Sequence, residues 1–190
     1  MHELEPYYSW RDLYIASEDE HSPFYQREYS EFEFSNAIYN YFIHPQWDKF
    51  DSNTMYLKVL FADYENQYCV IEFIGEWNDC INNDIMYLKR NVIDKMIREG
   101  IYKFVFIGEN ILNFHSSDDC YYEELFDEII DEGGWVAAVN FRDHVLEEMK
   151  AANINRYVNW NPALSNLLWR KLKPLQLYDV VDELIMKALT

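Results

Sequence analysis

The densest group of reactive side chains in this sequence is the run at residues 115–120, which reads His-Ser-Ser-Asp-Asp-Cys. His115, an aspartate and Cys120 could ligate zinc, but zinc ligands usually come from at least two elements, and no other residue has a spacing that completes such a set. Ser116 beside His115 could be an activated nucleophile, but the run lacks both a Gly-x-Ser-x-Gly turn and an acid that orients the imidazole. We therefore predict no metal site, no cofactor and no catalytic residue here.

The same run also fits the start of a helix. A serine at such a position accepts a hydrogen bond from a free backbone N–H group, so Ser116 or Ser117 would cap the helix. Asp118 and Asp119 would then lie in the first turn, where negative charge complements the helix dipole. Helix capping is the interpretation that the residues alone favour.

A second polar stretch, at residues 75–84, contains three acids that could act together. Glu76, Asp79 and Asp84 would form an acidic rim that attracts a cation or a basic partner. The other interpretation is a solvated loop whose asparagines cap the following helix, and we prefer it.

Both polar stretches together define an alternative in which the protein is an enzyme or binds a small ligand or metal. Its pocket would lie near residues 113–120, and His115, Asp118 and Asp79 would converge there. An enclosed pocket containing a histidine and an acid would support this alternative, whereas an exposed His115 would oppose it.

The elements that must position these residues lie between residues 56 and 160, where strand patterns alternate with helix patterns. Short apolar runs rich in β-branched and aromatic residues predict strands, and apolar residues at spacings of three and four predict helices. Gly100 follows one helix pattern, where a left-handed cap is expected. The order is β-β-α-β-α-β-α, which predicts an α/β fold with a mixed, mostly parallel sheet flanked by helices. The predicted strands are residues 56–61, 68–74, 102–107 and 135–139, and the predicted helices are residues 82–99, 120–132 and 142–152.

The N-terminal part, residues 1–55, is acidic and rich in Tyr and Trp. We predict an extension that packs on or beside the core, with residues 1–23 loose or stabilised by a partner. Residues 28–34 alternate polar and aromatic side chains as a strand would, but Phe34, Ile38 and Tyr41 also fit one helix face, and we predict a helix at residues 35–43. Exposed aromatic residues of this kind suit a protein interface, and an extra layer over the sheet explains them equally well.

The C-terminal part, residues 161–190, is close to neutral and should be helical. Asn161 and Pro162 form a typical helix start, and Pro174 ends that pattern. A second amphipathic stretch follows, with apolar residues from Leu177 to Leu189. This tail either packs back on the body, which we prefer, or docks another chain.

Composition excludes several classes of protein. The 190 residues contain 34 Asp and Glu against 16 Lys and Arg, a formal charge of −18, which argues against binding to nucleic acid or to an anionic membrane. No apolar run approaches the roughly 18 residues of a membrane span. The three cysteines match no zinc motif, so we expect a reduced, cytoplasmic protein.

The middle part, from about residue 56 to 158, resembles the STAS domain, the fold of anti-sigma-factor antagonists and sulfate-transporter tails. Residues 70–76 (VIEFIGE) look like the second strand of that family with its terminal Gly-Glu pair. Residues 111–117 (ILNFHSS) look like the loop after its third strand, and residues 133–139 (GGWVAAV) like its fourth strand. Residues 145–158 are similar to its last helix and the hydrophobic stretch that follows.

The resemblance implies a regulatory, non-enzymatic module that binds a partner protein or associates with itself. In partner-switching members of the family a loop serine at the helix start is phosphorylated, and Ser116 is the matching position. A phosphate there would be held by free backbone N–H groups and the helix dipole. His115 and Asp118 stand where the family motif has Asp and Gly, and Asp118 and Asp119 would repel a phosphate.

Overall fold

A four-stranded sheet forms the centre of the protein. The computed structural model describes residues 4–188, and its strands lie in the order β3-β4-β5-β6. β3 is antiparallel to β4, whereas β4, β5 and β6 are parallel to one another. The predicted α/β class, with its mixed and mostly parallel sheet and its order of elements, is confirmed. The strands are β3 (Met55–Asp63), β4 (Tyr68–Asn78), β5 (Lys103–His115) and β6 (Trp135–Val139).

Helices cover one face of this sheet, because that face presents an unbroken apolar surface. Its core includes Phe73, Trp77 and Phe106 from the strands and Ile93 and Ile129 from the helices. A five-residue π-helical segment, Lys89–Ile93, joins α2 to α3, and Gly100 ends the helical region with a φ of +89°. The helices are α1 (Asp79–Asn82), α2 (Asp84–Leu88), α3 (Asp94–Arg98), α4 (Cys120–Ile130) and α5 (Asp143–Ala151).

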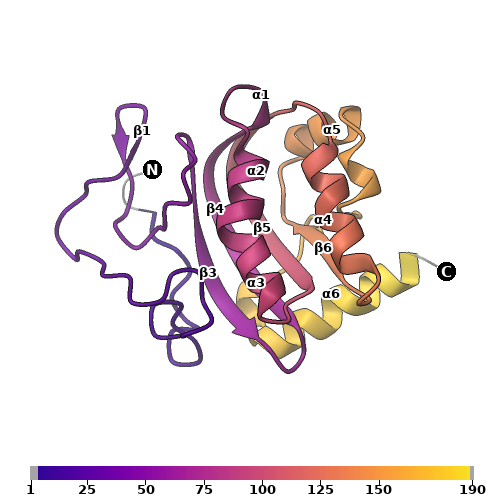
Figure 1. Cartoon of the computed structure of the whole chain (residues 1–190), viewed down its shortest axis with the longest axis horizontal. Helices are drawn as coiled ribbons and strands as arrows, with labels where there is room; N and C mark the ends of the chain where they lie inside the picture. Colours follow the sequence, from indigo (N-terminus) through magenta and orange to yellow (C-terminus); the bar gives the residue numbers. More distant parts are fainter. Residues whose placement is uncertain (1–3, 189–190) are drawn as a thin grey trace.

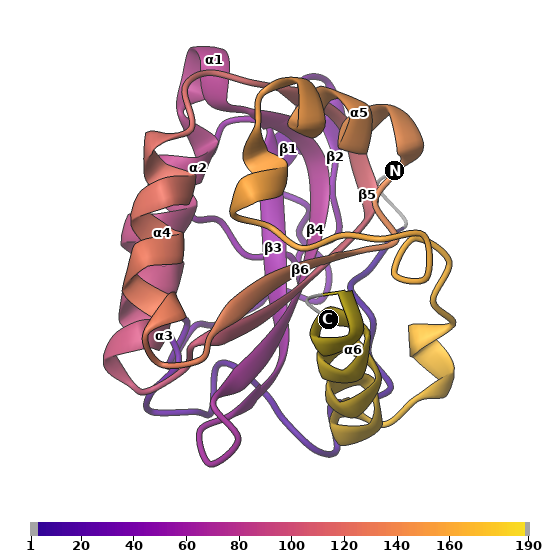
Figure 2. The ribbon, with the colours of Figure 1, turned by 90° about the vertical axis from the view of Figure 1, so that its right-hand side faces the viewer.

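The C-terminal tail covers the opposite face. Figure 2 shows α2, α3 and α4 on one side of the sheet and α6 (Pro174–Ala188) on the other. Trp169 and Val181 from the tail pack with Val70 and Val105 of the strands, and Trp10 from the N-terminal part joins the same cluster. The tail therefore packs back on the body, and it contributes Leu164, Trp169, Leu177, Val181 and Ile185 to the second core. Leu189, at the end of the predicted apolar stretch, lies outside the described residues.

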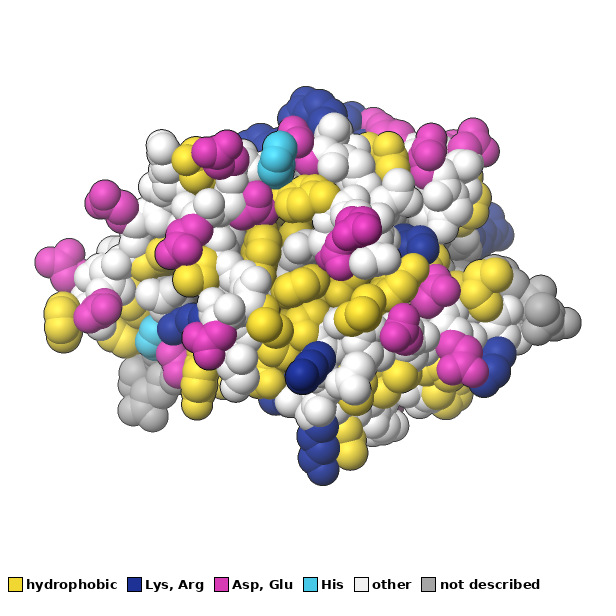
Figure 3. Space-filling view, turned by 90° about the horizontal axis from the view of Figure 1, so that it is seen from below, with side chains coloured by type: hydrophobic (Ala, Val, Ile, Leu, Met, Phe, Trp, Pro, Cys, Tyr) yellow, Lys and Arg dark blue, Asp and Glu magenta, His cyan; other side chains and the backbone are white. Residues whose placement is uncertain are grey.

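The N-terminal part is ordered where we expected a loose segment. Residues 4–26 fold into successive turns beside β3 (Figure 1). Trp10 and Phe24 are buried there, and the Trp10 indole N–H donates to the Leu172 carbonyl at 3.3 Å. Residues 1–3 of the segment predicted to be loose lie outside the described residues. Seen from below, hydrophobic side chains gather in the middle of the molecule, where this part meets the body (Figure 3).

The helix predicted at residues 35–43 is wrong, because this segment forms a small hairpin. β1 (Ala37–Ile38) pairs antiparallel with β2 (Tyr41–Phe42), and Tyr39 between them has a φ of +53°. The hairpin buries Ile38 and Ile43 together against Trp47, Tyr56 and Ile74. Periodicity within the segment could not reveal this packing, since the surface that selects it comes from later strands.

Two further predictions are corrected. The strand predicted to end at residue 107 continues to His115, since residues 110–115 pair with the end of β4 after two irregularities in register. The helix predicted to begin at Asn161 is a turn, because Asn140 N–H donates to the Leu164 carbonyl and the Asn140 side chain accepts from Leu167 N–H. A short 3-10 helix, Trp169–Lys171, leads from there to α6, and another, Ile154–Arg156, follows α5.

Within residues 4–188, no helix has both the length and the apolar character needed to cross a bilayer.

Replacing Trp169 tests whether the tail is part of the core. Trp169 is 1% exposed, so Trp169→Ala should lower the free energy of unfolding by about 3–5 kcal/mol in urea denaturation. Its neighbour Leu168 is 67% exposed, and Leu168→Ala should change the free energy of unfolding by less than about 0.5 kcal/mol. Equal effects of the two substitutions would contradict the packing described here.

Candidate functional site

The predicted loop lies at the end of β5, where the parallel strands finish. His115 is the last residue of β5, and α4 begins at Cys120. His115, Ser117 and Asp118 are exposed, and Ser116 is half-buried. Parallel sheets commonly bind ligands beyond these carboxyl ends of their strands.

No serine caps α4: its N-cap residue is Asp119, whose side chain makes no capping hydrogen bond, and a carboxylate contact at the helix start comes from Asp118. Cys120 N–H donates to Asp118 Oδ1 at 3.2 Å, and hydrogen bonds from Cys120 hold the pKa of the Asp118 carboxyl below its usual range. Asp119 accepts a hydrogen bond from the Tyr157 hydroxyl at 3.1 Å, which ties the helix start to the segment after α5. The first free N–H group of α4 is therefore already occupied by a carboxylate, and Ser116 lies outside this contact.

The predicted acidic rim does not form, because two of its three acids are buried. Asp79 and Asp84 are 3% and 0% exposed. Asp79 accepts from the Trp77 indole, the Tyr122 hydroxyl and Ile85 N–H, and Asp84 accepts from Asn78 N–H at 2.7 Å. Burial raises the pKa of Asp79 to about 6. These acids join β4 to its following helices.

Glu76 alone of the three acids reaches the surface. Its carboxylate accepts from the Tyr39 hydroxyl at 2.6 Å and from the Asn113 amide at 3.1 Å. Glu76 thus connects the β1–β2 hairpin to β5 two residues before His115. His115 and Asp79 do not converge, since Asp79 is enclosed by Trp77 and Tyr122. Among residues 4–188, no three His, Cys, Asp or Glu side chains gather as a metal site.

Sequence reasoning missed a buried carboxylate on the tail side of the sheet. Glu72, in the middle of β4, is 1% exposed. It accepts from Tyr7 N–H at 2.8 Å and lies 3.4 Å from the Arg170 guanidinium. Burial raises the pKa of Glu72 to about 7, although Tyr7 and Arg170 partly oppose the rise. The sequence does contain a signal of this buried carboxylate, because Glu72 is the only charged residue in the apolar run Val70–Ile74.

Glu109 of β5 completes this cluster. Its carboxylate accepts from Asn140 at 2.8 Å, from the Trp169 indole at 2.7 Å and from Arg170. Burial alone would raise the pKa of Glu109, but these three donors hold it below its usual value. Arg170 therefore lies between a stably charged Glu109 and a Glu72 that titrates near neutrality.

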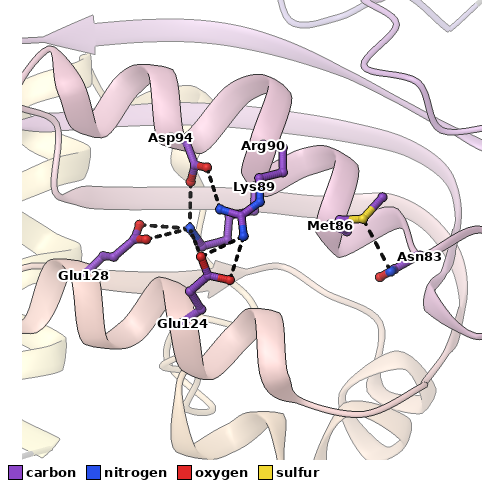
Figure 4. A network of polar contacts seen from close by, with 7 residues as sticks. All are labelled: Asn83, Met86, Lys89, Arg90, Asp94, Glu124 and Glu128. Atoms are coloured by element: carbon purple, nitrogen blue, oxygen red, sulfur yellow. Dashed lines mark hydrogen bonds and ion pairs between the residues drawn. The ribbon is translucent and has the colours of Figure 1, made fainter.

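A second network, shown in Figure 4, joins the helices on the other face. Lys89 is fully buried, and its ammonium lies 2.7 Å from Asp94, 2.9 Å from Glu128 and 3.3 Å from Glu124. Arg90 pairs with Asp94 and Glu124 at 3.0 and 2.8 Å. Burial would lower the pKa of Lys89, but hydrogen bonds to Asp94 and Glu128 raise it. The clustered acids of α4 are therefore partly neutralised from within the chain.

Neither network has the arrangement of a catalytic site. In each, the carboxylates and cations face one another at hydrogen-bonding distance, so their charges are satisfied by the protein. The two networks fix the layers of the fold.

Comparisons with known proteins show only weak likeness. No family model matches the chain, and no curated protein matches it. Among solved structures, the chain is similar to a crystal structure from Thermotoga maritima of a protein assigned as an anti-sigma factor antagonist. The identity is 17% and the TM-score 0.40, over 54% of this chain and 81% of the other. The fold described above stands on this chain's own elements.

The titration of Glu72 predicts how stability depends on pH. Its pKa of about 7 in the folded protein lies above the usual 4.5, so protonated Glu72 stabilises the fold at low pH, and this contribution is lost as the pH rises through 7. Between about pH 4.5 and pH 8 the loss should approach roughly 3 kcal/mol. Urea denaturation across this range should show a flatter profile for Glu72→Gln.

The matched control is Glu132→Gln, which changes an exposed acid in the turn after α4. It should leave the slope of the wild-type profile unchanged. Some slope should persist in Glu72→Gln, because Asp79 has a raised pKa as well. An identical slope in Glu72→Gln and wild type would show that Glu72 is not buried as described.

Proposed function

We propose that this chain is a non-enzymatic protein-interaction module of regulatory type, which docks a basic partner protein through the β1–β2 hairpin. The observation that carries the proposal is a group of exposed aromatic side chains on and beside the hairpin, named here the aromatic surface. Exposed apolar side chains that gather in one region commonly mark an interaction site. The group comprises Phe32 (87% exposed), Tyr39 (68%), Tyr41 (61%), Phe42 (55%) and Phe34 (36%).

The hairpin is held rigidly enough to present these rings in a fixed arrangement. Ile38 and Ile43 anchor it in their own small core, and Tyr39 donates to Glu76. Gly75 permits the close approach, because a Cβ atom there would lie 2.1 Å from the Thr54 carbonyl and 2.8 Å from Ile38 Cδ1. A surface ordered in advance costs less conformational entropy when a partner binds.

Charge supports a basic partner. Glu28, Glu31 and Glu33 are exposed within or just before the aromatic surface, and the whole chain carries a formal charge of −18. Lys and Arg side chains can pair with these carboxylates and lie over the aromatic rings. Phosphate backbones and anionic lipid surfaces would be repelled, which supports a protein as the partner.

The loop at Ser116 borders the same region. Asn113, three residues earlier, donates to the carboxylate of Glu76 that also accepts from Tyr39. As the STAS resemblance implies, phosphorylation of Ser116 would add about two negative charges beside the docking surface. Intact-mass analysis of the protein from its own cell should then find a phosphate that Ser116→Ala removes. The cytoplasm, where Cys69, Cys80 and Cys120 would stay reduced, is the compartment that we propose.

The double substitution Tyr41→Ser and Phe42→Ser tests the docking surface. Both side chains are exposed, so the fold should be retained, whereas loss of two aromatic anchors should weaken partner binding at least tenfold. The measurement is quantitative co-purification from the native cell, followed by titration of the recovered partner. Binding should also weaken in about 1 M salt, where the Debye length is about 3 Å.

The matched control is Leu168→Ser with Leu175→Ser, which removes two exposed apolar side chains of the tail. This variant should bind as the wild type does. Equal binding by the hairpin variant and wild type would overturn the proposed surface, and substrate turnover by the purified chain would overturn the non-enzymatic assignment.

A further inference from the structure

A pocket of about 410 Å³ lies between the N-terminal turns and β3; none of the aromatic residues of the aromatic surface and no residue of the Ser116 loop lines it. Residues 6–18 form one wall, and Lys58, Val59 and Leu60 of β3 form the other. Its volume is that of a site for a small organic molecule. The side chains that line it are unusual for so acidic a protein, because two of them are cations.

Lys58 supplies the first cation, at the base of this pocket. Its side chain is only 12% exposed, and its ammonium lies 3.2 Å from Asp48 and 3.7 Å from the centre of the Tyr29 ring. The Asp48 carboxylate also forms an ion pair with the Arg27 guanidinium at 3.4 Å, and it accepts a hydrogen bond from the Tyr29 hydroxyl at 2.7 Å. One buried carboxylate therefore balances two cations, and an ammonium group has three donors to satisfy.

Arg11 supplies the second cation, on the opposite wall. Among residues 4–188 it has no ion pair, and its guanidinium lies 6.0 Å from the Tyr8 ring centre. Burial lowers the pKa of Lys58, Asp48 opposes this, and the positive charges of Arg11 and Arg27 lower it further. Both cations line the same pocket, and an anion bound there would offset the repulsion between them.

The remaining lining selects among anions. Tyr7, Tyr14, Tyr29 and the buried Leu60 provide aromatic and apolar contact. Glu18 and Glu31 also line the pocket, and both are exposed. These two carboxylates of the protein repel polyanions such as nucleotides. A ligand with a single carboxylate can still reach the pocket cations.

We propose that this pocket binds a small monocarboxylate with an aromatic or apolar body, whose carboxylate is held by Arg11 and Lys58. The tyrosines and Leu60 contact the body of the ligand. An amino group on the ligand is compatible with Glu18 and Glu31, so aromatic amino acids belong to the same class. This site is independent of the proposed docking surface, and its ligand undergoes no reaction.

Two probes that differ only in charge test the site. Hydrocinnamate carries the carboxylate, and hydrocinnamamide has the same shape without it. Titrated into the full chain and followed by protein NMR, hydrocinnamate should shift signals of the residues that line the pocket, and hydrocinnamamide should not. Inorganic phosphate, which carries more negative charge than a monocarboxylate at neutral pH and has no apolar body, should bind more weakly than hydrocinnamate.

Arg11→Gln provides the test by substitution, because Arg11 is exposed and the fold does not depend on it. It should weaken hydrocinnamate binding about tenfold, the effect of one hydrogen bond to a charged group. Arg98→Gln, an exposed arginine on α3 outside this pocket, should leave binding unchanged. The proposal is overturned if hydrocinnamate does not bind at millimolar concentration, if the amide binds equally well, or if Arg11→Gln binds as the wild type does.

Discussion

The burial of one carboxylate, that of Glu72, constrains the whole tail side of the sheet. A charged group in the middle of a central strand must be given partners or be protonated, because its transfer out of water is costly. The protein brings both partners from distant parts of the sequence, the backbone of Tyr7 and the guanidinium of Arg170. The N-terminal turns and the C-terminal tail therefore meet over the same strand. Their contact extends through Trp10 and Trp169, whose rings lie 5.7 Å apart.

This constraint explains why the surfaces available for binding lie where they do. The N-terminal part is fixed against β3 and β4, so that the hairpin extends from the edge of the body and the pocket forms between residues 6–18 and β3. On the opposite face, the buried ammonium of Lys89 joins two elements in a similar way, because its ion pairs hold α4 against the π-helical segment. Buried charges specify how the layers of this fold meet, while the apolar clusters supply most of the stabilisation.

The sequence was sufficient for the order and type of the elements in the central sheet and its helices, because their patterns are local, although it missed the second half of β5. Strands such as Trp135–Val139 are apolar throughout, and α5 repeats its apolar residues at helical spacing. Patterns failed where distant contacts decide the conformation. Ile38 and Ile43 are packed by Trp47 and Ile74, which selects a hairpin over a helix, and Asn140 holds residues 164–167 in a turn. The predicted acidic rim was wrong for the same reason. Asp79 and Asp84 are polar residues, but Trp77, Tyr122 and the backbone of neighbouring elements enclose them.

The central claim is that the N-terminal turns and the tail together cover Glu72. The most direct measurement is a pH titration of the Glu72 side-chain carboxyl carbon by NMR in the full chain. A carboxyl covered in this way should titrate with a midpoint near 7, since burial raises the pKa of Glu72 to about 7. A midpoint near 4.5, the usual value for a glutamate in water, would mean that solvent reaches Glu72 and that the two segments do not meet over β4.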